Sequence, residues 1–456
     1  MSLSRQAVVS KAGRRQTNLP AAGPFSFAPH PWHTLRRERA NLDPDGVSSV
    51  EIFSRATDDT LWAVVATVAK TDRIAEVFRT RAAALEDWPE AERARVVGLH
   101  YDNYLLTVDL EDQAAQGEIV EVEREDGMKR IGVIKIPTFY VDFDAWQAGE
   151  EEFRSTTRDV AREVERLKEE GIDGIMLDLR NNGGGALQEA NSLIGLFIDR
   201  GPTVQVRDAR GRISLYGDTE AGTLYDGPLA VLVNRLSASA SEIFAGAIQD
   251  YGRGLVLGNA TFGKGTVQTL SDLSHGQIKL TRAKFYRISG ESTQHRGVEP
   301  DILFPNLVDP ERIGESSLDN ALEWDTVQEV QYRHYGEPWE YMETLRSRHR
   351  ERADTHPNFV FLEQRADMAR RLREEHTSVS LDREQRQREV EARDAEQLSL
   401  ENQRREALGL DLLEELVDAR DEDDEDEPVE RVQVTEAAAI LADYAELTQR
   451  RMASRF

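Results

Sequence analysis

Two stretches of this sequence repeat one pattern, in which a short apolar run leads through a loop of small residues into helical spacing. The first run is GIMLDL at 174–179, and helical spacing returns at 186–198. The second run is PLAVLVN at 228–234, and a helix is expected over 242–249. Because strand, loop and helix in succession form the repeating unit of α/β proteins, the pattern predicts an α/β core.

The sequence around these units extends the same core. Alternating apolar and polar residues flank Asp126 and Gly127, a dipeptide that favours the positive φ of a tight turn, and so predict a β-hairpin. Residues 155–170 have apolar side chains at helical spacing, and Gly171 can take the left-handed conformation that ends a helix. LVLGNATFGKGTVQTL and GQIKLTRAKFYRIS then read as β-rich. We therefore expect a mixed α/β core of strands with packed helices, in which a β-rich segment carries a lysine.

The C-terminal part has a different composition. From about residue 315, long segments rich in Glu, Arg and Gln predict charged helices. The acidic run DARDEDDEDEPVE at 418–430 is expected to be a solvated linker. A last helix at 436–450 has one apolar face, with Thr435 as its N-cap, and should dock on the core.

The first hundred residues contain no motif with a chemical mechanism. Residues 1–45 show no period and are assigned no structure, and helical pieces are expected at 72–84 and 88–98. These patterns divide the chain into an N-terminal region at 1–106, an α/β core at 107–312 and a helical C-terminal region at 313–456.

Composition excludes several classes of function. The chain has 84 acidic and 57 basic residues, a net charge of −27, which disfavours binding to nucleic acid. It has no cysteine, which excludes disulfides and thiolate chemistry, and no metal-ligand cluster is evident. Its longest apolar runs, such as LWAVVATVA at 61–69, are shorter than the roughly 18 residues that span a bilayer. We expect no cofactor, no nucleic acid and no membrane span, and the first thirty residues lack the apolar stretch of a secretory signal.

A serine-rich turn, NRLSASASEIFAGAIQD, lies where the second strand meets its helix. Small residues at such a junction can expose a hydroxyl beside the unpaired amides of a helix N-terminus, which suits a nucleophile. Ser237, Ser239 and Ser241 could equally be helix caps. The turn alone does not choose among the three.

Lys264 lies between two glycines in TFGKGTVQ at 261–268. A phosphate-binding loop is excluded, since Gly265 occupies the position that needs Ser or Thr and no helical pattern follows. By itself this lysine would be a surface residue of a hairpin.

A lysine can activate a serine only when its amine is neutral. Its pKa must then fall from about 10.4 to about 7–8, which burial can achieve without a carboxylate partner. Phe262 and Val267 provide apolar neighbours for Lys264. Gln268, four residues on, could hold the amine through its amide oxygen without adding a charge.

A third segment, LRNNGGGAL at 179–187, is a glycine loop between strand and helix. Three glycines allow backbone amides to approach a substrate carbonyl, as an oxyanion hole requires, although a plain tight turn would look the same. The amide of Ala240 would supply a second donor. Nucleophile, base, base-holding amide and oxyanion donors are together the set that acyl transfer needs.

SASASEI, TFGKGTVQ, the upstream RNNGGGAL and the downstream KFYRISGESTQHRGVEPDI closely resemble the tail-specific proteases, which are C-terminal processing peptidases with a Ser-Lys dyad. The resemblance runs from about residue 107 to the C-terminus. In this family the nucleophile lies 25 residues before the lysine, which implies Ser239. It also implies Gln268 as the partner of the lysine, and oxyanion amides from Ala240 and the Gly184/Gly185 turn.

The resemblance has further implications for this chain. It marks Asp250, at the end of the helix after the nucleophile, as a catalytic-site residue, for which we expect a mainly structural role. It implies an endopeptidase that selects proteins with accessible apolar C-terminal tails, a periplasmic or cell-envelope location, and an adaptor or a second copy of the chain as further partners. It also implies a PDZ domain, which is not readable in 1–106.

Two other functions remain as alternatives. A Ser-His-Asp hydrolase would use His275 or His295 as base, but neither histidine lies beside a G-x-S-x-G motif. A non-enzymatic or impaired scaffold relative of the family would account for the charged helices and the missing capture domain.

Overall fold

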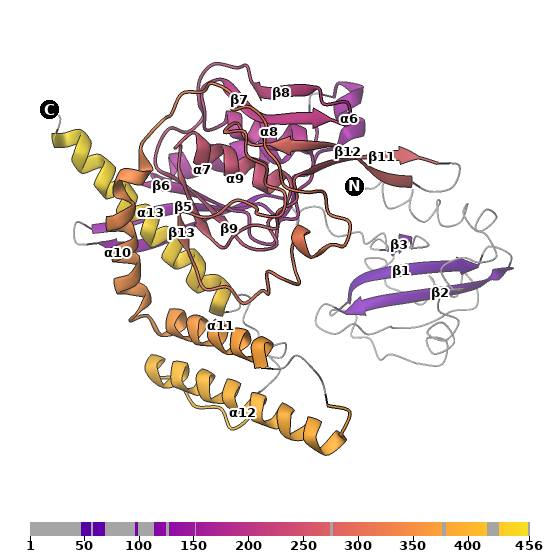
Figure 1. Cartoon of the computed structure of the whole chain (residues 1–456), viewed down its shortest axis with the longest axis vertical. Coiled ribbons are helices and arrows are strands. Elements are labelled where there is room, and N and C mark those ends of the chain that lie inside the picture. The colour runs from indigo at the N-terminus through magenta and orange to yellow at the C-terminus, as the bar shows by residue number, and fades with distance from the viewer. Residues whose placement is uncertain are drawn as a thin grey trace. The chain divides into compact units, whose positions relative to one another are not determined.

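The computed structural model describes residues 47–55, 58–68, 96–98, 114–124, 127–150, 152–273, 277–375, 380–416 and 428–454. The chain divides into two compact units, Met1–Gln113 and Ala114–Phe456. Figure 1 labels the elements of both units. The candidate site lies in the second unit.

The first unit contains a three-stranded sheet in the order β2-β1-β3. Strand β1 (Val47–Arg55) pairs antiparallel with β2 (Asp58–Val68) and parallel with β3 (Val96–Gly98). The helix expected at 88–98 is therefore wrong at its end, because the β-branched Val96 and Val97 pair with a neighbouring strand. The arm 1–45 and the helix expected at 72–84 lie outside the described residues.

A six-stranded sheet forms the centre of the second unit, in the order β13-β10-β9-β6-β5-β4. All neighbouring strands from β5 to β13 are parallel, whereas β4 runs antiparallel to β5 and forms the expected hairpin up to Gly127. Every residue of β6 and β9 is buried, as expected for parallel strands covered on both faces. The strands are β4 (Gln116–Arg124), β5 (Gly127–Lys135), β6 (Gly174–Asp178), β9 (Leu229–Val233), β10 (Leu255–Gly258) and β13 (Ile302–Leu303).

Helices α7, α8 and α9 bury their apolar side chains in the core on one face of this sheet. Helix α7 (Thr156–Glu169) starts after its N-cap Ser155, and Gly171 beyond it has a φ of 77°. Helices α8 (Leu187–Gly195) and α9 (Ala240–Asp250) each follow a loop from a parallel strand, as the sequence predicts. The short helix α6 (Phe143–Ala148) precedes them.

A separate four-stranded antiparallel sheet, in the order β11-β12-β7-β8, packs through β7 and β12 against the same core. Its strands are β7 (Gly201–Asp208), β8 (Ile213–Asp218), β11 (Thr266–Asp272) and β12 (Gln277–Tyr286). The β-rich segment of the sequence thus forms the β11–β12 hairpin, with a register shift between Val267 and Gln268.

The other face of the six-stranded sheet is covered by the C-terminal helix α13 (Pro428–Ser454), together with α10 (Met342–Ala353) and α11 (Pro357–Glu375). Figure 1 shows the long helix α13 running across the sheet. Docking of the last helix agrees with the sequence analysis, but its start does not. Helix α13 begins at Pro428, so the last three residues of the expected linker are helical and Thr435 is no N-cap: its hydroxyl donates to the carbonyl oxygen of Arg431.

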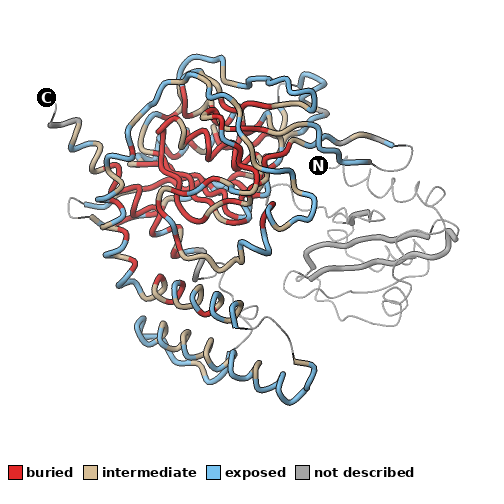
Figure 2. Tube along the Cα trace, viewed as in Figure 1, coloured by how far each residue is buried: buried red, intermediate tan, exposed pale blue. Residues whose placement is uncertain are grey.

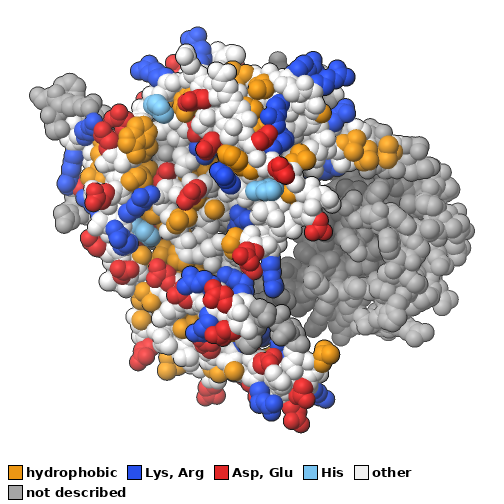
Figure 3. Space-filling view, viewed as in Figure 1, with side chains coloured by type: hydrophobic (Ala, Val, Ile, Leu, Met, Phe, Trp, Pro, Cys, Tyr) orange, Lys and Arg blue, Asp and Glu red, His pale blue; other side chains and the backbone are white. Residues whose placement is uncertain are grey.

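The helical region also begins later than residue 315. Between 315 and 341 the chain forms only two short 3₁₀ helices, η2 (Glu315–Ser317) and η3 (Pro338–Tyr341), within irregular chain. Helix α12 (Arg383–Leu408) has no buried residue, and Figure 3 shows charged side chains of both signs spread over α11 and α12. Of the helices that the structure describes, none combines the length and apolar character that a membrane crossing needs.

Candidate active site

Three loops meet at the carboxyl edge of the six-stranded sheet, after the neighbouring strands β6, β9 and β10. The loop after β6 carries Gly184, the turn after β9 carries Ser239, and the loop after β10 carries Lys264. Open α/β sheets bind their ligands at this edge. Segments 80 residues apart are therefore brought to one place by strand order.

Ser239 occupies a strained turn. Its φ of 57° and ψ of −108° lie outside the ordinary regions for a residue with a side chain, and strain of this kind concentrates at functional sites. A strand-to-helix turn of this type exposes its central hydroxyl. Ser237 and Ser241 are fully buried, and their Oγ atoms donate to the carbonyl oxygens of Leu179 at 2.8 Å and Asn182 at 2.9 Å. The geometry favours the partly exposed Ser239 among the three.

A buried carboxylate joins the turn of Ser239 to the loop of Lys264. Glu242 is fully buried, and its Oε2 accepts from the backbone amides of Ser239 at 2.7 Å and Lys264 at 2.9 Å. Its Oε1 accepts from Thr261 Oγ1 at 2.6 Å and from the amide of Gly263 at 2.7 Å. The backbone nitrogens of Ser239 and Lys264 therefore lie close together, because both contact the same oxygen atom.

Burial raises the pKa of Glu242 to about 7, against the opposing effect of its four hydrogen bonds. Glu242 was named in the sequence only as the start of a helix. The signal that could have found it is the capping-box spacing of a serine followed three residues later by glutamate. Arg235, also unforeseen, is buried and supports the same loop by donating to the carbonyl oxygen of Thr261.

Lys264 and Gln268 are brought together as their spacing predicts. Lys264 Nζ donates to Gln268 Oε1 at 3.1 Å, and the lysine is half-buried. Burial lowers the pKa of Lys264, the charge of Lys279 lowers it further, and the charges of Glu315 and Glu242 raise it. The direction is the one that a lysine base requires.

The glycine loop lies against the serine turn. Gly184 has a φ of 102°, and a Cβ there would lie 2.8 Å from the Cβ of Ser239 and 3.0 Å from the amide nitrogen of Ala240. Gly185, with a φ of 148°, packs so closely on Phe139 that a Cβ would lie 2.1 Å from the carbonyl oxygen of that residue. Both positions require glycine.

The two candidate oxyanion donors from this region differ in availability. The amide of Gly184 donates to Asn182 Oδ1 at 2.8 Å, so that in this structure it is engaged. Ala240 begins helix α9, and its amide has no carbonyl one turn earlier in the helix. Asn182, which the sequence analysis missed, also accepts from the amide of Ala238 and thereby joins the glycine loop to the serine turn.

Asp250 is not brought to the other site residues. It is the last residue of α9, eleven residues after Ser239, which corresponds to roughly 16 Å along a helix. Its buried carboxylate accepts from Arg287 Nε at 3.1 Å and from Ser289 Oγ at 3.3 Å. These contacts join α9 to the chain after β12.

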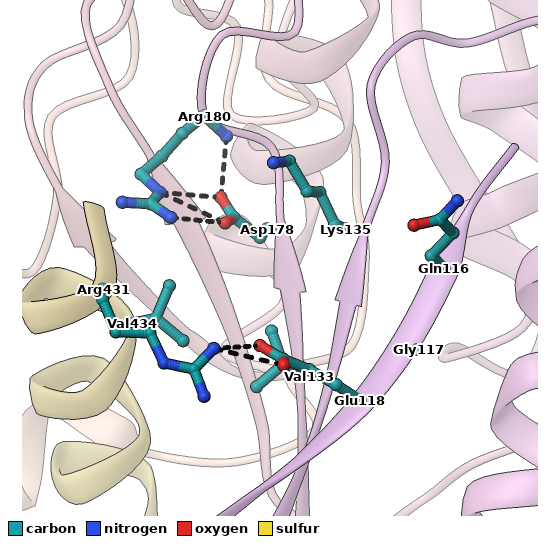
Figure 4. Close-up of a pocket in the computed structure, with 9 residues that line it drawn as sticks. All are labelled: Gln116, Gly117, Glu118, Val133, Lys135, Asp178, Arg180, Arg431 and Val434. Atoms are coloured by element: carbon teal, nitrogen blue, oxygen red, sulfur yellow. Dashed lines mark hydrogen bonds and ion pairs between the residues drawn. The ribbon is translucent and has the colours of Figure 1, made fainter. Parts of the chain in front are cut away.

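A charged cavity of about 230 Å³ lies beside the glycine loop, between strands β4–β6 and helix α13. Figure 4 shows its two ion pairs, in which Arg180 Nη2 contacts Asp178 Oδ2 at 2.8 Å and Arg431 Nη1 contacts Glu118 Oε1 at 3.0 Å. Lys135 also lines the cavity. The pair of Arg431 and Glu118 joins α13 to strand β4, whereas Arg180 and Asp178 lie two residues apart at the end of β6.

The alternative base His295 and the phosphate loop find no support among the described residues. His295 Nε2 is buried and has no hydrogen-bond partner among the described residues, and His275 lies outside them. Strand β11, and no helix, follows Gly265. Across the described ranges, no group of three or more His, Asp or Glu side chains is placed to hold a metal ion.

Comparisons with known proteins match the segments that carry this site. The model of peptidase family S41 matches residues 130–304, which include the serine turn and the lysine loop. The model of the C-terminal domain of tail-specific protease matches residues 308–446. Residues 130–304 of this chain belong to peptidase family S41. The resemblance read from the four motifs is thereby confirmed.

Relatives within the family include bacterial and chloroplast enzymes. The tail-specific protease of Haemophilus influenzae is 39% identical over 72% of this chain and 46% of its own length. The chloroplastic C-terminal processing peptidase of Tetradesmus obliquus is 39% identical over 35% of this chain and 34% of its own length. The chain thus spans less than half the length of these curated relatives.

A solved structure, that of the photosystem II D1 C-terminal processing protease, is 34% identical over 40% of this chain and 43% of its own, with a TM-score of 0.33. The predicted fold class, a mixed α/β core with a β-rich segment and charged C-terminal helices, is confirmed. The roles of the individual site residues and the region boundaries at 106 and 312 stay predictions.

Proposed function

We propose that this chain is a serine endopeptidase in which Ser239 is the nucleophile and Lys264 the general base. The observation that carries the proposal is the single carboxylate of Glu242, whose Oε2 binds the backbone amides of both residues. The strained, partly exposed turn of Ser239 and the lowered pKa of Lys264 support it further.

In the first half of the reaction, neutral Lys264 Nζ takes the proton of Ser239 Oγ while Oγ bonds to the carbonyl carbon of the scissile peptide. The carbonyl π electrons move to its oxygen, where the amide of Ala240 and an amide of the Gly184/Gly185 turn donate hydrogen bonds. The C–N bond then breaks, Lys264 returns its proton to the leaving amine, and an acyl-enzyme ester remains.

In the second half, Lys264 takes a proton from water as the water oxygen attacks the ester carbonyl. Collapse of this intermediate releases the carboxylic acid, and the proton returns to Ser239 Oγ. Gln268 keeps the lysine nitrogen in place throughout, and its neutral amide adds no charge that would stabilise the ammonium form.

The proposed substrates are proteins with an accessible, apolar C-terminal tail. Support comes from the printed names of the relatives, which are tail-specific and C-terminal processing enzymes. We further propose that an adaptor or a second copy of the chain takes part in substrate capture. The regions 1–106, 107–312 and 313–456 are proposed to serve capture, chemistry and support of the core.

The test is cleavage of an unstructured protein that carries an apolar tail, with mass spectrometry of the products. Ser239→Ala should lose at least about a thousandfold in kcat/KM, whereas Ser237→Ala, on the matched buried serine, should remain active. A substrate whose tail ends in charged residues should be cleaved with a higher KM and a similar kcat, because tail binding is shared by ground and transition states.

Three results would contradict parts of this proposal. Undiminished cleavage by Ser239→Ala would exclude the nucleophile. Equal kcat/KM for apolar and charged tails would exclude tail selection. A folded wild-type chain that cleaves no substrate, yet binds one, would favour the non-enzymatic scaffold.

A further inference from the structure

Lys279 lies on the same face of the β11–β12 hairpin as Gln268, the residue that binds the proposed base Lys264. The strand register pairs Gln268 of β11 with Thr281 of β12. Lys279 lies two residues before Thr281 on β12, and side chains two residues apart in a strand point to the same face. Lys279 and Gln268 are therefore diagonal neighbours on this face.

The same face carries a chain of contacts that starts at the base. Lys264 Nζ donates to Gln268 Oε1 at 3.1 Å, and Gln268 Nε2 contacts Thr281 Oγ1 at 3.5 Å. Diagonal neighbours in an antiparallel pair lie about 7–8 Å apart, within reach of long side chains. Lys279 therefore lies diagonally across from the residue whose amide holds Lys264 Nζ, and its charge lowers the pKa of Lys264.

The charge of Lys279 is uncompensated in the part of the chain that the structure describes. No ion pair engages Lys279 there, whereas Lys284, farther along β12, is paired with Asp325. An unpaired ammonium near Lys264 disfavours protonation of Lys264.

We propose that Lys279 is a positioning residue of this active site, acting by its charge across the hairpin to keep Lys264 in the form that accepts the serine proton. The inference deepens the proposed function and rests on Lys264 as base. Other charged groups that face Lys264 from described elements are Glu315 of η2 and Glu242 of α9. Both carboxylates favour the ammonium form, so Lys279 is the charge that opposes them.

Because Lys279 is exposed, its effect should be modest and sensitive to salt. Coulomb attraction or repulsion at such a separation in a solvent-rich site changes an equilibrium about two- to threefold. The acid limb of the pH profile is the range over which activity falls because Lys264 becomes protonated. This limb should therefore lie at lower pH in the wild type than in a variant without this charge.

The first experiment measures kcat/KM against pH for wild type, Lys279→Met and Lys279→Glu, with an uncharged unstructured peptide. At about 20 mM salt the acid limb should move to higher pH in that order. On this limb kcat/KM should fall two- to threefold in Lys279→Met and by a larger factor in Lys279→Glu. The alkaline plateau should be unchanged, and about 500 mM salt should bring the profiles together. Arg282→Gln removes an exposed charge from the same strand and should leave the profile in place.

A second experiment reads the base without catalysis. In the inactive Ser239→Ala background, the rate at which an amine-reactive acylating reagent modifies Lys264 is followed against pH by mass spectrometry, with and without Lys279→Met. The Lys279→Met variant should need a higher pH for half-maximal reactivity of Lys264. This shift would support the inference even if no peptide were cleaved, a result that would contradict only the proposed function.

Two outcomes would overturn the inference. One is a pH profile and a Lys264 reactivity that do not change in either Lys279 variant. The other is a change in KM with an unmoved acid limb, which would mean that Lys279 contacts substrate and does not act on the base.

Discussion

The proposed nucleophile and the proposed base are held by two regions of very different character. Ser239 follows β9, in which every residue is buried, and is the N-cap of α9, whose residues 240–248 are all buried. Lys264 lies in the loop just before the β11–β12 hairpin, along which Gln268 and its neighbour Thr269 are exposed. Figure 2 shows the contrast between the buried parallel sheet and the exposed hairpin.

This difference shows how a precise site can include a peripheral element. The hairpin ends in exposed apolar side chains, Leu273, Ile278 and Leu280, visible as a group in Figure 3, and by itself would hold a lysine loosely. Glu242 extends the rigidity of α9 to the loop before the hairpin through its bonds to Gly263 and Lys264. Substitutions in the two regions, and in the link between them, should therefore differ in size and kind.

The largest effect is expected at the base itself. Lys264→Arg keeps the charge but should lose at least about a thousandfold in kcat/KM, because a guanidinium stays protonated and cannot accept the serine proton. Lys168→Arg, on the surface of α7, is the matched control and should retain activity. Turnover of Lys264→Arg at the wild-type rate would mean that this lysine is only an electrostatic anchor.

The next largest effect is expected at the link. Glu242→Gln places an amide NH₂ where two donors now converge, which leaves one oxygen to accept and forces the turn or the loop to move. We expect a loss of about a hundredfold in kcat with a smaller change in KM. Retained activity would show that the hairpin is positioned by other contacts.

The same variant tests the raised pKa of Glu242. A carboxyl with a folded-state pKa of about 7 contributes stability that is present below its ordinary value of 4.5 and is lost as the pH rises through 7. The thermal midpoint of the wild type should therefore fall relative to that of Glu242→Gln between pH 5 and pH 8. Parallel midpoints across this range would mean that the buried carboxyl is ionised throughout.

On the exposed side of the comparison, Gln268→Glu should reduce activity at pH 7 at least about tenfold. A carboxylate beside Lys264 Nζ stabilises the ammonium form, so the acid limb of the pH profile should move to higher pH. Gln268→Ala should lower kcat without this displacement, and Thr269→Val, at the adjacent exposed position, should do neither. An unmoved limb in Gln268→Glu would argue against Lys264 as the titrating base.

The smallest effect on chemistry is expected at Asp250, in the buried region but at the far end of α9. Asp250→Asn should destabilise the fold by about 3 kcal/mol, since it leaves the largely buried guanidinium of Arg287 without its ion pair. Below its thermal midpoint, the variant should keep kcat/KM within about tenfold of wild type. A loss of a thousandfold in a folded variant would assign Asp250 a direct part in catalysis.

Local patterns were sufficient for much of this fold. Helix α7 with its stop at Gly171, the hairpin of β4 and β5, and the strands β6 and β9 followed from periodicity and turn residues, because each depends on neighbours within a few positions. The family was readable from motifs that keep chemical groups at fixed spacing. Gln268 was placed beside Lys264 by the same logic of strand spacing.

Other features depended on residues distant in sequence. Packing on the sheet sets the start of α13 and the irregular chain at 315–341. Local helix propensity does not predict such packing. The convergence of Gly184, Ser239 and Lys264 required the order of strands β6, β9 and β10.

The sequence alone therefore determined the class of fold, the family and the residue types available for catalysis. Only the tertiary structure decided which serine is strained and partly exposed, and which carboxylate links it to the lysine loop. The physical reason is that Glu242, which is fully buried, acts through hydrogen bonds to residues about 20 positions away in the sequence. Such a contact leaves no periodic trace in the sequence.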